Sequence, residues 1–152
     1  MMKQAQISNL GITEALGIQG WRHLDSILLA ALATESPLLL VGPHGTAKSL
    51  LVEKLAQALS LSLRHYNASL LNYDDLVGIP LPAEGTNQLE FISTPGAIWD
   101  AEFVFFDEIS RCRPDLQNKM FPIVHERRVA GYSPRKSAAS VGSDEPARAR
   151  RP

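Results

Sequence analysis

A short stretch with two glycines, a lysine and a serine is the part of the sequence most able to do chemistry. It reads GPHGTAKS from Gly42 to Ser49. Gly42 and Gly45 permit backbone conformations that a side chain forbids, so successive N–H groups can converge on phosphate oxygens. Lys48 adds a mobile positive charge, and Ser49, at the start of a helix, can ligate Mg²⁺. The stretch therefore predicts a loop that binds phosphate groups.

The loop departs at one position from the phosphate-loop pattern GxxxxGK[ST]. Ala47 stands where that pattern has its second glycine. If Ala47 has helical dihedral angles, it needs no positive φ and its methyl group is tolerated. The alternative is a tight turn with a surface lysine, because short motifs also occur without function.

Two adjacent carboxylates supply the second half of a phosphate site. Asp107 and Glu108 follow the apolar run Phe103 to Phe106, which is typical of a buried strand. Asp107 can hold Mg²⁺ through water, and Glu108 can orient or deprotonate the water that attacks a γ-phosphate. The alternative, two acids exposed at a strand end, is disfavoured because both motifs occur together and in the expected order.

The elements that must position these residues alternate between strands and helices. The run Leu38 to Val41 predicts a parallel strand buried on both faces. The spacing of apolar residues predicts a helix after the loop, with Leu51 and Leu55 buried. Further helices and strands are expected over residues 21–34, 63–67, 70–77 and 89–92, and from 114 onward. An α/β fold with a parallel sheet flanked by helices follows.

Several other residues have ordinary structural explanations. His65 is expected to be a core or edge histidine rather than a catalytic one, and Cys112 has no base beside it in the sequence. Pro122 predicts a kink or break of its helix near Asn118, whose carbonyl loses its partner. The charges of His125 to Arg128 are expected to be solvated at a helix end.

The composition is that of a single domain, and it has no feature typical of proteins that bind nucleic acid or membranes. The chain has 152 residues, with 15 basic and 16 acidic side chains and a net charge of −1. Its single cysteine excludes an internal disulfide. The first ten residues lack the apolar core of a signal peptide, and no apolar run is long enough to span a bilayer. We therefore expect a cytoplasmic protein that binds neither nucleic acid nor membrane.

The amino-acid sequence around the two motifs resembles that of the MoxR-like AAA+ ATPases. The resemblance rests on GPHGTAKS, on NASLLNYDDLVGIPLP from Asn67 and on VFFDEISRCRPDLQNKMFPIVHERRV from Val104. Members of this class accept GxxGxxK[ST], so Ala47 is ordinary there. The resemblance implies a chaperone or remodelling ATPase that binds ATP, ADP and Mg²⁺, forms a homo-oligomeric ring when intact, and acts on a protein client.

The resemblance also assigns roles to individual residues. It implies that Lys48 and Glu108 are catalytic and that Ser49 and Asp107 hold Mg²⁺. It places Ile18 beside the adenine, with a core contact as the open alternative. It makes the region Gly78 to Pro95 an insertion that engages substrate, with an ordinary surface hairpin as the open alternative. The nucleotide is expected to contact Gly42, Pro43, His44, Gly45, Thr46, Ala47, Lys48, Ser49 and Leu50.

The end of the chain departs from the family. Residues 133–152 carry almost no large apolar side chain, so we expect a disordered tail after a partial AAA+ core over residues 1–132. The family's sensor-1 strand, fifth strand and helical lid are not recognisable. Because the family's strand order is 5-1-4-3-2, a gap is expected beside the strand Leu38 to Val41. Our hypothesis is a truncated or frameshifted relative.

Two functions remain open at this stage. The first is ATP binding with Mg²⁺-dependent hydrolysis, slowed by the missing parts. The second is a non-catalytic, nucleotide-binding fragment that docks on full-length AAA+ subunits. A small-molecule kinase is disfavoured by Glu108 and by the lack of an arginine-rich lid.

Overall fold

The computed structural model describes residues 11–82, 85, 89–92, 94–128 and 139–144. Its centre is a four-stranded parallel sheet in the order β1-β6-β5-β2. The strands are β1 (Leu38–Val41), β2 (Leu63–Asn67), β5 (Phe103–Asp107) and β6 (Ala139–Asp144). The predicted strands 38–41 and 63–67 are confirmed, and β5 runs one residue past the predicted apolar run.

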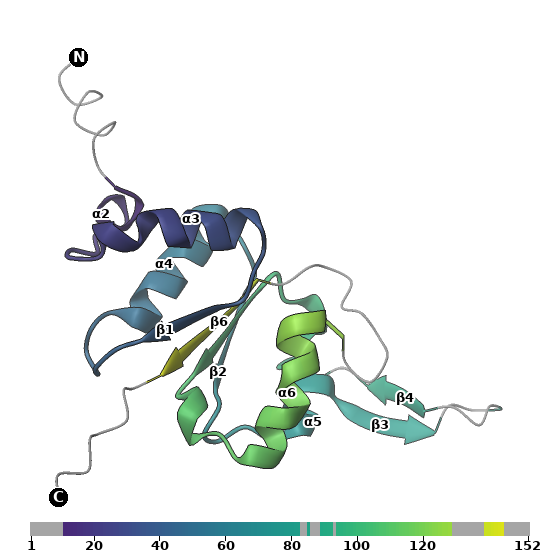
Figure 1. Ribbon diagram of the computed structural model, residues 1–152. Coiled ribbons are helices and arrows are strands. Elements are labelled where there is room, and N and C mark those ends of the chain that lie inside the picture. Colours follow the sequence, from purple (N-terminus) through teal and green to yellow (C-terminus); the bar gives the residue numbers. More distant parts are fainter. Residues whose placement is uncertain (1–10, 83–84, 86–88, 93, 129–138, 145–152) are drawn as a thin grey trace, which may run out of the picture.

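Helices cover both faces of this sheet (Figure 1). On one face lie α2 (Ile12–Ala15), α3 (Asp25–Ala33) and α4 (Lys48–Leu59), with the short turn η1 (Arg22–Leu24) before α3. On the other face lie α5 (Tyr73–Val77) and α6 (Pro114–Glu126). Two further short turns, η2 (Ile98–Asp100) and η3 (Ile109–Arg111), flank β5. No described helix is both long and apolar enough to cross a membrane.

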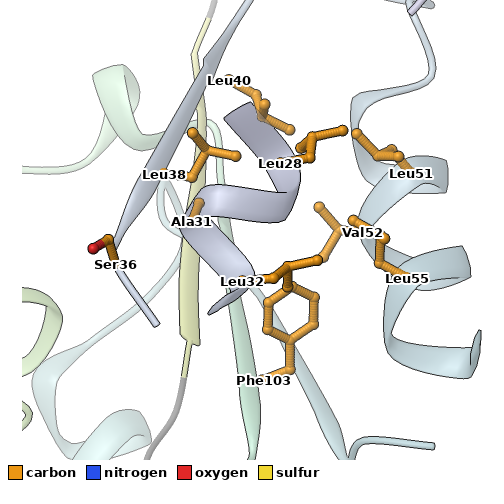
Figure 2. Close-up of a pocket in the computed structure, with 10 residues that line it drawn as sticks. All are labelled: Leu28, Ala31, Leu32, Ser36, Leu38, Leu40, Leu51, Val52, Leu55 and Phe103. Carbon is orange, nitrogen blue, oxygen red and sulfur yellow. The ribbon is translucent and has the colours of Figure 1, made fainter. Parts of the chain in front are cut away.

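The alternating side chains of β5 divide the core in two. Phe103 and Phe105 pack with α3 and α4, whereas Val104 and Phe106 pack with α5 and α6. All four are at most 1% exposed. Figure 2 shows the first half, where side chains of α3, β1, α4 and β5 surround a cavity of only about 20 Å³. Such close packing is normal for a folded interior.

The strand before the phosphate loop is not buried on both faces, contrary to the prediction. Leu40 points into the core beneath α3 and α4 and is 7% exposed. Leu39 and Val41 point the other way and are 56% and 59% exposed. The reason is that α6 lies over β5, and β1 is an edge strand of the described sheet.

The segment expected to be disordered contributes the strand β6. Residues 139–144 pair with β1 on one side and with β5 on the other, with Gly142 opposite both Leu39 and Phe106. The predicted central gap is therefore filled, and the order 1-4-3-2 is confirmed for the four parallel strands among the described residues. Backbone pairing on both sides compensates for the lack of large apolar side chains in this segment. The rest of the predicted tail lies outside the described residues.

A small antiparallel hairpin projects from the body beside α6 (Figure 1). Its strands are β3 (Ile79–Pro82) and β4 (Leu89–Ile92). The Oη of Tyr66 donates to the carbonyl of Gly96 at 2.5 Å, and the indole N–H of Trp99 donates to the carbonyl of Val77 at 2.7 Å. These two hydrogen bonds fasten the base of the hairpin to the core.

The helix α6 bears on the prediction made for Pro122. It is continuous from Pro114 to Glu126, so a break near Asn118 is excluded, and the alternative of a kink stays a prediction. Its first residue is Pro114, where the missing N–H costs nothing. The short helix α2 is joined to α3 by a side-chain hydrogen bond, in which the Thr13 hydroxyl donates to Asp25 Oδ1 at 2.7 Å. That hydrogen bond lowers the pKa of the Asp25 carboxyl.

Candidate functional site

The phosphate loop joins β1 to α4, and its backbone turns through two left-handed residues. Gly45 has φ 74° and Ala47 has φ 66°. The helical dihedral angles considered for Ala47 are therefore wrong, because Ala47 adopts the conformation that glycine favours. Gly42 has no positive φ, so of the two glycines only Gly45 needs its conformational freedom.

Lys48 is the first residue of α4 and is buried, with 9% of its surface exposed. Its Nζ donates to the carbonyls of Gly42 and Pro43, each at 2.9 Å. A buried ammonium group needs such partners, because its desolvation is costly. The two carbonyls therefore hold the positive charge of Lys48 inside the loop.

Ser49 and Asp107 bring the two sequence motifs together. The Ser49 hydroxyl donates to Asp107 Oδ2 at 3.2 Å, across 58 positions of the sequence. A hydroxyl and a carboxylate are the hard oxygen ligands that Mg²⁺ prefers. The described residues contain no cluster of three or more His, Cys, Asp or Glu suited to a metal. The donor set thus fits a Mg²⁺ ion that takes its remaining ligands from water and phosphate.

Glu108 lies directly after β5 in a left-handed conformation, with φ 54°. Its carboxylate is 25% exposed and has a partner on each oxygen. Arg111 Nη1 lies 3.2 Å from Oε1, and the Ser69 hydroxyl lies 3.5 Å from Oε2. The carboxylate is thus partly shielded and held in one place, as a group that must position water requires.

The loop and the acid pair line one open hollow of about 230 Å³. Most of the predicted site residues meet there: His44, Gly45, Thr46, Ala47, Lys48, Ser49, Leu50, Asp107 and Glu108. Gly42 and Pro43 do not line the hollow, but their carbonyls hold Lys48. Ile18 is not part of it either, because its side chain is 4% exposed and packs in the core with α3 and α4.

Three residues near the acid pair were not assigned to the site from the sequence. Ser69 and Arg111 contact Glu108, and His65 Nε2 lies 3.7 Å from Asp107 Oδ2. The parallel register of β2 with β5 places Asn67 opposite Asp107, which brings His65 and Ser69 to this end of the sheet. The spacing of Glu108 and Arg111 was visible in the sequence, but the short turn η3 that joins them was not predicted.

Two other candidates have structural roles. Arg127 is not simply solvated, because its guanidinium donates to the carboxylate and the carbonyl of Glu35 and so joins the end of α6 to the turn before β1. Burial raises the pKa of the Cys112 thiol, whose Sγ lies 3.9 Å from the Met120 sulfur. A buried, protonated thiol is a poor nucleophile.

Comparison with known proteins places this site in a family. The model of the AAA domain of the dynein-related subfamily matches residues 37–141, more than half of the chain. The matched region contains β1, the phosphate loop, both acid residues and the beginning of β6.

Solved structures share the fold at low sequence identity. A protein from Cytophaga hutchinsonii assigned as an ATPase matches 88% of the chain with 22% identity and a TM-score of 0.64. Hsp104, in a closed state with ATPγS and FITC-casein, matches 95% with 15% identity and a TM-score of 0.65. NtrX from Brucella abortus matches 84% with 16% identity and a TM-score of 0.56. The chain spans 42%, 28% and 31% of these three proteins respectively.

Proposed function

The chain belongs to the AAA domain family, dynein-related subfamily, and we propose on the basis of its site that it binds ATP with Mg²⁺ and hydrolyses the terminal phosphate. One observation carries the proposal. Ser49 and Asp107, far apart in the sequence, lie within 3.2 Å of each other beside the buried Lys48. A phosphate-binding lysine, a magnesium ligand and an acid on the adjoining strand are the parts that phosphoryl transfer needs.

Each residue has a distinct role in this proposal. Lys48 exchanges its two carbonyl partners for oxygens of the β- and γ-phosphates, so its charge stays paired. Ser49 and Asp107 hold the metal, which when bound neutralises charge on the phosphates. Glu108 orients the attacking water and accepts its proton. The N–H groups at the start of α4 favour the phosphate charge.

Hydrolysis should be slow for this chain alone. No arginine is among the described residues that line the hollow. An arginine at the γ-phosphate contributes about 10³–10⁵ in rate in related phosphoryl transfers. We therefore expect nucleotide binding with little turnover, unless another subunit supplies the arginine.

Finer assignments extend the same proposal. Hsp104 was solved with ATPγS and casein, which supports ATP as the nucleotide and a protein as the client. The MoxR-like type and a ring of identical subunits rest on the sequence resemblance, whereas the cytoplasmic location rests on the apolar runs of the sequence, none of which is long enough to span a bilayer. The projecting hairpin, with Ile79 55% and Ile92 53% exposed, offers apolar side chains to such a client.

A second function is favoured by the uncovered face of β1. Leu39 and Val41 are exposed there, and Phe121 of α6 is 66% exposed beside the same face. A chain with this surface could dock on longer AAA+ subunits without hydrolysing nucleotide. Co-purification of the chain with a full-length relative, lost on changing Leu39 and Val41 to Ser, is the expected result.

Thermal unfolding with and without nucleotide tests the primary proposal. Mg·ADP or Mg·ATPγS at 100 times its dissociation constant should stabilise the folded chain by roughly 2.7 kcal/mol. Lys48→Ala should abolish this gain. Lys54→Ala is the matched control, because Lys54 is exposed on the same helix, and it should keep the gain.

Hydrolysis is tested separately with Glu108→Gln. This variant should bind nucleotide as the wild type does and release no phosphate. A wild-type transition that is indifferent to nucleotide would contradict the binding proposal. Equal phosphate release from the wild type and Glu108→Gln would contradict only the role of Glu108.

A further inference from the structure

Glu108 is held from outside the nucleotide hollow by a residue that does not line it. Arg111 contacts the carboxylate at 3.2 Å, and the hollow is bounded by Glu108 but not by Arg111. The arginine side chain is 55% exposed, whereas that of Glu108 is 25% exposed. Arg111 therefore lies on the solvent side of the carboxylate.

The backbone between the two residues is fixed in a tight turn. The N–H of Arg111 donates to the carbonyl of Glu108 at 2.9 Å, which closes the turn η3. The amide of Gln117, on α6, donates to the carbonyls of Ile109 at 3.0 Å and Cys112 at 3.2 Å. Since α6 packs on the core, these bonds fix the backbone of the turn that carries Arg111 next to Glu108.

The positive φ of Glu108 means that surrounding contacts must hold this residue in its conformation. Left-handed dihedral angles cost a non-glycine residue free energy and persist only where surrounding contacts determine them. The contact from Ser69 is longer, at 3.5 Å, so Arg111 is the stronger of the two partners. Without the guanidinium, the carboxylate could rotate away from the hollow.

We propose that Arg111 is a positioning residue for hydrolysis: its ion pair with Glu108 directs that carboxylate toward the phosphate hollow. The inference rests on the proposed function, because it assigns Glu108 to the attacking water. Arg111 itself does not line the hollow in which nucleotide and metal would bind. Its effect is therefore confined to turnover, while nucleotide affinity depends on the loop.

The experiment compares Arg111→Ala, Arg111→Lys and a control, Arg113→Ala. Arg113 is similarly exposed, at 61%, and contacts Asp115 and Asn72 rather than Glu108. The dissociation constant of Mg·ATPγS and the kcat for phosphate release at saturating ATP are measured on the full chain. A melting temperature for each variant confirms that it is folded.

We expect Arg111→Ala to lower kcat about twofold to fivefold, the size that an exposed ion pair supports. Its dissociation constant should match the wild type, Arg111→Lys should recover part of kcat, and Arg113→Ala should change neither quantity. Raising salt to about 1 M, where the Debye length is about 3 Å, should lower the wild-type kcat toward that of Arg111→Ala.

The outcomes separate this inference from the function on which it rests. If the wild type hydrolyses ATP and Arg111→Ala has the same kcat, only the positioning role of Arg111 is overturned. Weaker ATPγS binding in Arg111→Ala also overturns it, because the residue then acts on the loop. A wild type that binds ATPγS without any turnover overturns both the hydrolysis proposal and the inference.

Discussion

At the scale of single residues, Ala47 shows how a functional loop can carry strain. Its φ of 66° lies in the left-handed region, which costs an alanine about 1–2 kcal/mol. The residue directly precedes Lys48, so its dihedral angles set the direction in which α4 starts. The loop keeps this conformation because Lys48 and Thr46 both donate to the carbonyl of Pro43.

The first prediction follows from this strain. Ala47→Gly should raise the free energy of unfolding by about 1 kcal/mol, because glycine adopts a positive φ without steric cost. Ala58→Gly, at an exposed position of the same helix, should instead lower it by up to about 1 kcal/mol. Denaturant unfolding of both variants measures the difference. A lower stability in Ala47→Gly would mean that Ala47 is not left-handed in solution.

At the scale of elements, Tyr66 connects the central sheet to the projecting hairpin. The side chain is buried in β2, and its hydroxyl donates to Gly96 after the hairpin. Burial raises the pKa of Tyr66 to about 12. The folded chain therefore keeps the phenol proton at pH values where the unfolded chain, with a pKa near 10, loses it.

The second prediction is a loss of stability in alkali. Between about pH 10 and pH 12 the folded state binds more protons at Tyr66 than the unfolded state, so stability falls as pH rises through this window. Below pH 10 the contribution of Tyr66 is fully present. Tyr66→Phe should cost about 1 kcal/mol at neutral pH and flatten the alkaline decline. Equilibrium unfolding at a series of pH values distinguishes the two proteins.

The elements that could be predicted from the sequence are those with strong local signals. The strand at Leu38 is an apolar run bounded by proline and glycine, and the structure has both this strand and the one at Leu63 over the predicted residues. The loop and the acid pair were identifiable because their residue types and order reflect phosphate chemistry. The position of β6 was not predictable, because a segment of small and polar residues owes its conformation to the strands on either side.

Some details of the site could not be predicted from the sequence, for a related reason. The dihedral angles of Ala47 and the pairing of Glu108 with Arg111 depend on how the chain turns, which residue spacing does not specify. The exposure of Leu39 and Val41 depends on which strands and helices are present to cover them. The first two features are set by local turns of the chain, and only the exposure of Leu39 and Val41 is set by elements distant in the sequence.

At the scale of the whole molecule, β6 is the strand that unites the two halves of the sheet. It pairs with β1 on one side and β5 on the other, and no described contact pairs β1 with β5 directly. Gly142 lies opposite residues of both neighbours, and a Cβ there would lie 3.3 Å from the Leu39 side chain. Because Leu39 is 56% exposed, it has room to move.

The third prediction uses two substitutions at this glycine. Gly142→Ala should be nearly neutral, because Leu39 can shift by a few tenths of an ångström. Gly142→Pro removes a backbone donor from a central strand and should cost at least about 1–3 kcal/mol, with a loss of cooperative unfolding. Chemical denaturation followed by circular dichroism tests both. Equal stability of the two variants would mean that β6 does not occupy the centre of the sheet.

The place of β6 in the sheet also has a consequence for how the chain folds during synthesis. Residues 38–41 are made long before residues 139–144, and the two segments become neighbours only when β6 inserts. Contacts between such distant segments form late and slow the folding reaction. Until then, the apolar edges of β1 and β5 face each other without their common partner. A nascent chain at that stage exposes two open strand edges, the kind of surface that chaperones bind and that aggregates form from.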